Sequence, residues 1–333
     1  MWNKRVLLVG MQWDYGIKDR GPSLDQTIFS ETLKQLVAYN EVFWFDDYIK
    51  DGKNLEESLA RKIEETKPDL IMFLLYTEQF SIQFLDQLKQ KYQTYGWFGD
   101  DQWRFESFSQ KYAPHFTYVS TTDQWAVSKY RRLGIEPILT QWAAQRFNDN
   151  YGVIDDIIYE YDVSFVGQYN EVRGWFVKKL AQAGINVVCF GAGWDNGRIT
   201  FEDMENIFRA SKINLNISNS VSQDIRFVCG GIRNFARWLL SPKRSEQIKA
   251  RNFEIPLAGG FQLTNYVVGL ERYWRIGEEI AIYSTVEDCA KQVEFYLEHV
   301  EIRNNIVAKS YERANREHTY FSRLSHVLEE IWG

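Results

Sequence analysis

The chain has 333 residues, a length that favours two domains of ordinary size over one. Hydrophobic residues make up 45% of it and charged residues 25%, so each half can bury a core of its own. The net charge of −6 argues against a surface built for nucleic acid or acidic membranes, although local basic clusters are compatible with it.

Cysteine usage and the lengths of the apolar runs indicate a cytoplasmic protein. The three cysteines, Cys189, Cys229 and Cys289, are far apart and odd in number, and none has the spacing of a disulfide framework or a zinc site. The apolar stretch near the N-terminus is too short for a signal peptide, and the longest apolar run, residues 70–76, is too short to cross a membrane. We therefore expect a soluble protein of a reducing compartment, without a membrane span.

The first half of the chain alternates strands with helices. Helical patterns lie between the strands, most clearly at 24–37, 54–67 and 81–93. Buried strands are expected at 4–10, 41–46, 68–76, 95–101, 116–122 and 137–143. This alternation predicts βαβ units and a parallel sheet.

The second half repeats the pattern after a polar, acidic linker at about 145–160. A strand ending at Gly167, a helix, and a second strand ending at Gly191 come first, and further strands are expected at 212–218 and 279–283. Helical periodicity then extends from residue 286 to 331, with breaks near 298–302 and near His318.

Together these elements predict an α/β protein with two Rossmann-like domains, 1–150 and 151–333. The C-terminal helices follow the second sheet, and the last one can pack back onto the first domain. Open α/β sheets bind ligands beyond the carboxyl ends of their strands, so a ligand is expected in a central cleft that the two domains face.

The stretch "KARNFEIPLAGGFQLTNY" (249–266) carries the chemistry in this interpretation. Lys249 and Arg251 precede a predicted helix, whose N-terminus offers free N–H groups and a positive dipole end to an anion. Glu254, one turn further, can accept two hydrogen bonds from a ribose diol; alternatively it is a partner for Arg251. Gly259 and Gly260 end the helix and allow a close backbone approach.

These residues carry a resemblance to a known family. The segments "RNFEIPLAGGFQLT", "GEEIAIYSTVEDCAKQVEFYLEH" and "HTYFSRL" resemble the C-terminal region of spore-maturation CgeB-like glycosyltransferases, and the relation extends through "FVGQYNEVRGWF" to "WFGDDQWRF" in the first half. The resemblance implies a GT-B fold, with the acceptor on the first domain and a nucleotide sugar on the second. Glu246 and Glu254 also reproduce the E-x7-E spacing of many retaining GT-B enzymes; whether the reaction retains or inverts stays open.

Other candidate donor contacts follow the strands of the second half. Gly167 admits a phosphate at a strand-to-helix turn, and the resemblance implies that Arg173 clamps it; the alternative is an ordinary turn with a surface arginine. Gly191, in a G-x-G after a strand, could face the base. Asn216 could hydrogen-bond the nucleotide from its strand end or, as readily, cap neighbouring backbone.

The candidates for the general base lie in the first half of the chain. Asp100 and Asp101 end the strand of "GWFGDD", where adjacent carboxylates raise one pKa; the alternative is an N-cap for a helix starting near Trp103. Asp14 is a second candidate. No D-x-D pair occurs in the sequence, which favours a metal-independent reaction without a cofactor other than the donor.

The leading hypothesis is thus a glycosyltransferase acting on a nucleotide sugar and a carbohydrate or other hydroxyl acceptor. A second hypothesis keeps the fold without turnover, as a carbohydrate- or nucleotide-binding structural module. A third makes a nucleic-acid base the acceptor, with the basic stretch 226–244 tracking phosphates; the negative net charge makes nucleic acid the weakest candidate partner. Trp97, Trp103 and Trp194 are candidates for stacking on a sugar, and His318 is either structural or near the donor.

Overall fold

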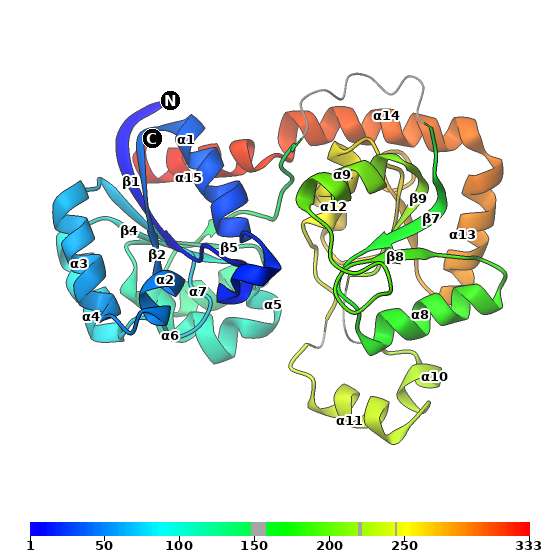
Figure 1. The fold of residues 1–333 in the computed structure, drawn as a ribbon, viewed down its shortest axis with the longest axis horizontal. Coiled ribbons are helices and arrows are strands. Elements are labelled where there is room, and N and C mark those ends of the chain that lie inside the picture. Colours follow the sequence, from blue (N-terminus) through cyan, green and yellow to red (C-terminus); the bar gives the residue numbers. More distant parts are fainter. Residues whose placement is uncertain (148–157, 219–221, 244) are drawn as a thin grey trace. The chain divides into compact units, whose positions relative to one another are not determined.

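The computed structural model describes residues 1–147, 158–218, 222–243 and 245–333. They form two compact units, coloured along the chain in Figure 1. Unit 1 contains residues 1–141 and 320–333, and unit 2 contains the described residues of 142–319. The expected boundary at residue 150 lies outside the described residues; the chain enters unit 2 at Trp142 and returns to unit 1 at Tyr320.

Unit 1 is built on a six-stranded parallel sheet in the order β2-β1-β3-β4-β5-β6. β3 and β4 are buried along their whole length, and β1 is buried from Val6 to Gly10, as parallel strands covered by helices require. The strands are β1 (Trp2–Gly10), β2 (Val37–Trp44), β3 (Leu70–Phe73), β4 (Thr94–Phe98), β5 (Tyr118–Thr121) and β6 (Ile138–Leu139). β4 therefore ends before Asp100, so the two aspartates expected at its end lie in the following turn and helix.

Helices cover both faces of this sheet. Asn54 and Ser81 cap two of them by accepting a hydrogen bond from the backbone N–H three residues later. The last helix packs on the helix that precedes β2, with the rings of Phe29 and Tyr320 5.5 Å apart. The helices are η1 (Asp14–Gly16), η2 (Lys18–Arg20), η3 (Asp25–Ser30), α1 (Glu31–Leu36), α2 (Phe45–Lys50), α3 (Leu55–Thr66), α4 (Ile82–Lys91), α5 (Asp101–Arg104), η4 (Phe105–Ser109), α6 (Gln110–Tyr112), η5 (Ala113–His115), α7 (Ala126–Arg132) and α15 (Tyr320–Trp332).

Unit 2 is built on a five-stranded parallel sheet in the order β11-β10-β9-β7-β8. The strands are β7 (Tyr161–Val166), β8 (Val188–Phe190), β9 (Ser211–Asn216), β10 (Gln262–Asn265) and β11 (Ala281–Tyr283). Because all strands are parallel, their carboxyl ends lie along one edge of the sheet, and the segments that follow Val166, Asn216, Asn265 and Tyr283 meet there.

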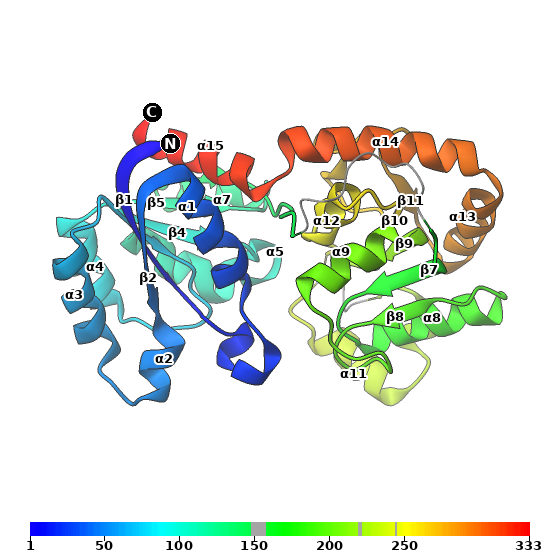
Figure 2. The same ribbon diagram turned by 45° about the horizontal axis from the view of Figure 1, so that its top comes forward.

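The helices of unit 2 form a layer on each face of the sheet, which Figure 2 shows from a second side. α9 and α12 contact each other on one face, and α8 and α13 on the other. The helices are α8 (Glu171–Gln182), α9 (Phe201–Arg209), α10 (Ile225–Val228), α11 (Ile232–Leu240), α12 (Arg251–Leu257), η6 (Leu270–Arg272), α13 (Val286–Glu298) and α14 (Val300–Glu317). The helical breaks predicted near 298–302 and His318 are confirmed.

Candidate functional site

The carboxyl edge of the unit 2 sheet gathers two arginines and two glutamates. Arg173 comes from α8, and Arg251 and Glu254 come from α12. Glu246 lies in the segment before α12 and accepts a hydrogen bond from Ser218 at the end of β9. These four charged side chains define the candidate site.

Arg251 points into the sheet edge. It is the first residue of α12, it is partly buried, and its guanidinium donates hydrogen bonds to the carbonyls of Val166 and Ile217. The guanidinium also lies 5.1 Å from the ring centre of Phe165. Burial lowers the pKa of Arg251 to about 10, and the nearby Glu254 opposes that shift. Its position is thus fixed by the ends of β7 and β9.

The prediction that backbone N–H groups at the N-terminus of α12 bind an anion is wrong. The N–H groups of Asn252, Phe253 and Glu254 already donate to the carbonyls of Lys249 and Ala250, so they are not available to a phosphate. α12 also has only seven residues and contains Pro256, which limits any helix dipole. Any anion held here would be bound by side chains.

Arg173 is the second cation at this edge. It is buried, and its three guanidinium nitrogens donate to the carbonyls of Ile217, Gln168 and Ser218. Burial and, to a smaller extent, the positive charge of Arg251 lower its pKa to about 9. Two mutually repelling guanidiniums are therefore held together by backbone carbonyls, an arrangement that an anion would stabilise.

Glu254 has the fewest polar contacts of the four charged side chains of the site. Its side chain is partly buried, and no hydrogen bond or ion pair joins its carboxylate to a residue that the structure describes. Burial raises its pKa to about 7, and Arg251 only partly opposes this rise. The alternative interpretation, a direct partner for Arg251, therefore lacks a contact. A carboxylate held in this state is typical of ligand-binding positions.

Gly167 and Gly191 make room for Arg251. A Cβ at Gly167 would lie 2.3 Å from Nη1 of Arg251, and a Cβ at Gly191 would lie 2.5 Å from the carbonyl oxygen of Gly167. Trp194 closes this pair of loops, because its Nε1 donates to the same carbonyl at 2.9 Å. Trp194 therefore has a structural role in this loop pair, and we do not expect it to stack on a sugar.

The remaining predicted donor contacts have structural partners. Gly259 ends α12 with a φ of 78°, and a Cβ at Gly260 would lie 2.6 Å from the carbonyl oxygen of Phe208. Both precede β10, at the amino edge of the sheet, so they support the fold and lie away from the site. Asn216 is buried and donates to the side chain of Gln262. Lys249 donates through Nζ to Gln247.

A cavity that the sequence did not predict adjoins Glu246. It has a volume of 310 Å³, and its lining includes Ser218, Asn265, Tyr283 and Thr285, in addition to Glu246. The Tyr283 hydroxyl donates to the carbonyl of Asn216. The E-x7-E spacing was the one feature of the sequence that indicated Glu246; nothing in the sequence singled out Tyr283.

In unit 1, Asp14 and Asp100 lie beyond the carboxyl ends of β1 and β4. Both are partly buried and both lie near Tyr15. Burial raises the pKa of Tyr15, and Tyr76, Asp14 and Asp100 raise it further. Tyr15 has a φ of 55°, an uncommon conformation for a bulky residue that is often found at functional sites. The sequence did not indicate Tyr15.

Asp101 is unsuited to the role of a base that meets an acceptor. It is completely buried and accepts hydrogen bonds from the hydroxyls of Thr121 and Tyr130 at 2.6 and 2.9 Å. Burial raises its pKa to about 6, although these hydroxyls oppose the shift. Its side chain instead ties α5 to β5 and α7.

Two further carboxylates hold the loop after β1. Asp25 accepts a hydrogen bond from the N–H of Met11, and Asp46 accepts from those of Gln12 and Trp13. Burial raises the pKa of Asp25 to about 7; the hydrogen bond from Met11 opposes this rise and the charge of Asp46 adds to it. These acids shape the loop that carries Asp14.

Three other candidates have packing roles. Trp97 is buried and contacts the edge of Phe29, with ring centres 5.1 Å apart. Trp103 lies beneath the guanidinium of Arg104. His318 is buried, and its Nε2 lies 2.9 Å from the carbonyl oxygen of Tyr273. His318 is thus structural.

The described part of the chain contains neither a cluster of metal ligands nor a membrane-spanning helix. Among these residues, no group of three or more His, Cys, Asp or Glu side chains is arranged to hold a metal ion. No helix within the described ranges is both long and apolar enough to cross a membrane.

The fold is an α/β fold of the GT-B glycosyltransferase type. Three solved structures match almost the whole chain. They are HepE of Anabaena in complex with UDP and glucose (TM-score 0.61, 12% identity, 99% of each chain covered), sucrose-phosphate synthase of Thermosynechococcus elongatus (0.65, 10%, 99% of each) and a glycosyltransferase of Rickettsia africae (0.63, 9%, 98% of this chain and 97% of that one). At such identities, the likeness establishes the fold alone.

Sequence comparison adds the nature of the second half. Residues 173–329 match the family model described as "Glycosyl transferase-like", so this part of the chain is similar to that family. The match includes Arg173, Glu246, Arg251 and Glu254. No curated protein matches the chain in sequence.

Proposed function

We propose that the chain is a glycosyltransferase that moves a sugar from a nucleoside-diphosphate donor to a hydroxyl acceptor. The observation that carries this proposal is Glu254, a half-buried carboxylate without a hydrogen bond or ion pair to a described residue, near the guanidinium of Arg251, which in turn interacts with that of Arg173. A nucleoside diphosphate offers both complements: hydroxyls that can donate to a carboxylate, and phosphate oxygens that can accept from guanidiniums.

The donor would lie along the carboxyl edge of unit 2. The carboxylate of Glu254 would accept hydrogen bonds from the 2′- and 3′-hydroxyl groups of the ribose. Arg173 and Arg251 each have N–H donors beyond those given to backbone carbonyls, and these would bind the diphosphate and stabilise its charge as it leaves. We place this reaction among the metal-independent transfers, because the arginines supply the positive charge that a metal ion would otherwise supply.

The transfer makes one bond and breaks one. An acceptor hydroxyl oxygen bonds to the anomeric carbon as the bond from that carbon to the diphosphate oxygen breaks, and the hydroxyl proton passes to a base. If the reaction inverts, Asp100 or Asp14 would be this base, since both are partly exposed whereas Asp101 is buried.

We also propose a specific donor and a specific family. UDP-glucose is the first donor to test, because the structurally similar HepE has been solved with it. The resemblance of residues 249–323 places the chain with the CgeB-like transferases. We also propose a cytoplasmic location, since all three cysteines are free.

Calorimetric titration with UDP-, GDP-, ADP- and dTDP-sugars tests the proposal, with and without EDTA. We expect micromolar to millimolar binding of one donor that EDTA does not change. Lack of binding to every donor would contradict the proposal. Release of nucleoside diphosphate over time separates an enzyme from a binding module, because a module would bind the donor and leave it intact.

A further inference from the structure

α11 exposes several apolar side chains along one face. Ile232, Phe235 and Leu239 are spaced three and four residues apart, which puts them on one face of the helix, and Leu240 adjoins them. Ile232 is 90% exposed and Leu240 is 79% exposed, and no residue of α11 is buried. Apolar side chains at helical spacing normally face a core, so this face indicates a partner.

The short helix before α11 anchors this segment to unit 2. Phe227 is buried on α10 and packs with Val172 of α8. Arg226 pairs with Glu287 of α13, and Arg237 pairs with Glu171 of α8 at 3.1 Å. Figure 1 shows α10 and α11 beyond α8, at the margin of the unit. α11 is therefore held in place while its apolar face stays outside.

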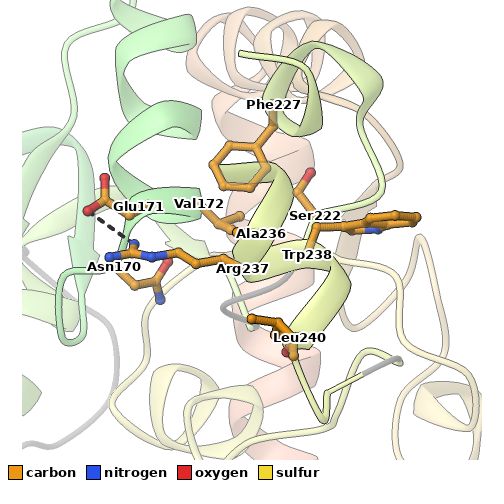
Figure 3. A pocket seen from close by; sticks show the side chains of 10 residues that line it. Asn170, Glu171, Val172, Ser222, Phe227, Ala236, Arg237, Trp238 and Leu240 are labelled. Carbon is orange, nitrogen blue, oxygen red and sulfur yellow. Dashed lines mark ion pairs between the residues drawn. The ribbon is translucent and has the colours of Figure 1, made fainter. Parts of the chain in front are cut away.

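The segment that carries this face is rich in cations, two of which, Arg226 and Arg237, are paired with acidic side chains. Residues 225–245 include five cations, Arg226, Arg233, Arg237, Lys243 and Arg244, and no acid, in a chain whose net charge is −6. Arg233 is exposed and forms no ion pair with a residue that the structure describes. Figure 3 shows Arg237 reaching from α11 to Glu171 across a cavity of 440 Å³, with Trp238 pointing to the other side.

We propose that α11 docks on an anionic lipid surface. Ile232, Leu239 and Leu240 would enter the acyl region, and Arg233 would pair with headgroup phosphates. A short amphipathic helix with exposed aliphatic residues and flanking cations is the pattern of interfacial membrane helices. This inference does not depend on the proposed transferase activity.

Two other partner classes fit the face less well. Proteins that bind single-stranded nucleic acid stack bases on aromatic rings, whereas the most exposed side chains here are aliphatic. Protein interfaces depend mostly on Trp, Tyr and Arg, and leucine is under-represented among their main contributors. Aliphatic side chains can pack against lipid acyl chains without any specific polar contact.

Co-sedimentation of the full chain with lipid vesicles tests the inference. The vesicles are of phosphatidylcholine alone or with about one-third phosphatidylglycerol, a typical anionic lipid content for such assays. We expect wild type to bind the anionic vesicles at least about tenfold more tightly than the neutral ones, and less tightly at high salt. Ile232→Ser with Leu240→Ser should weaken binding about tenfold or more, and Arg233→Gln about fivefold.

Matched variants control for general loss of surface residues. Val268→Ser with Ile302→Ser removes two exposed aliphatic side chains elsewhere in unit 2, and Lys178→Gln removes one exposed cation. Both should bind vesicles as wild type does. Unchanged melting temperatures would show that the α11 variants fold, as expected for side chains that make no core contacts.

Four results would overturn the inference. The first two are equal binding to neutral and anionic vesicles, and equal losses of vesicle binding in the control variants. The other two concern a protein that does not bind vesicles: concentration-dependent self-association that the α11 variants abolish, or salt-dependent binding to duplex nucleic acid. The last two would assign the face to a second copy of the chain or to nucleic acid.

Discussion

Glu254→Gln should make the protein more stable and a poorer binder of its donor. The folded-state pKa of Glu254, about 7, lies above the ordinary 4.5 because of burial. Between these two values the unfolded chain releases a proton that the folded chain keeps, so ionisation at higher pH destabilises the fold. Gln is nearly isosteric and uncharged, so it avoids this cost.

The gap between 4.5 and about 7 corresponds to about 3 kcal/mol when the penalty is complete, above pH 7. At pH 5 less than about 1 kcal/mol of it remains, because Glu254 is then mostly protonated in the folded state. For a unit of this size, Glu254→Gln should raise the melting temperature by roughly 5–10 °C at pH 8 and little at pH 5. Loss of charge-assisted hydrogen bonds to two ribose hydroxyls should weaken donor binding about 10- to 100-fold.

Calorimetric unfolding at pH 5 and 8 and donor titration measure the two effects. Glu294→Gln, an exposed glutamate on α13, is the control, and neither quantity should change in it. A lower melting temperature of Glu254→Gln at pH 8 would show that the carboxylate has a stabilising partner. Unchanged donor affinity would refute the ribose contact.

Three other substitutions probe the site and its supports. Gly167→Ala should displace the guanidinium of Arg251, whose Nη1 lies 2.3 Å from the new Cβ, and should weaken donor binding at least tenfold in titrations. Asp101→Ala should destabilise unit 1 by about 2–4 kcal/mol in urea unfolding, because two buried hydroxyls lose their acceptor. If the reaction inverts, Asp100→Asn or Asp14→Asn should lower the transfer rate at least about 100-fold and leave donor affinity unchanged.

Each of these has a matched control. Gly231→Ala adds a methyl group where no atom lies within 4 Å and should change neither stability nor affinity; an equal loss there would refute the steric argument for Gly167. Thr122→Ala removes a neighbouring hydroxyl outside the Asp101 contacts and should cost less than Asp101→Ala. Wild-type turnover in both Asp100→Asn and Asp14→Asn would exclude them as bases.

Most of the order of strands and helices followed from the sequence because it depends on local patterns; α10, α11 and β10 were not predicted. The apolar runs within 4–10 and 70–76 favour strands buried on both faces, and the helical patterns between the strands favour parallel sheets. The breaks that separate α13, α14 and α15 were also predicted. Strand ends were predicted less accurately: β4 ends at Phe98, and Asp101 lies in the following helix, where it accepts a hydrogen bond from Thr121 that no local pattern reveals.

The sequence by itself predicted two parallel α/β sheets and placed Arg173 six residues after Gly167, which follows a strand, since local periodicity and spacing determine such positions. It placed Arg251 and Glu254 only at the start of a helix. Tertiary structure alone decided what each group faces. It placed the guanidinium of Arg251 against the carbonyls of Val166 and Ile217 and used the N–H groups of Asn252, Phe253 and Glu254 within the segment. It also left the carboxylate of Glu254 without a hydrogen bond or ion pair to any residue in the described ranges. Such contacts join residues far apart in the chain, so periodicity and composition contain no record of them.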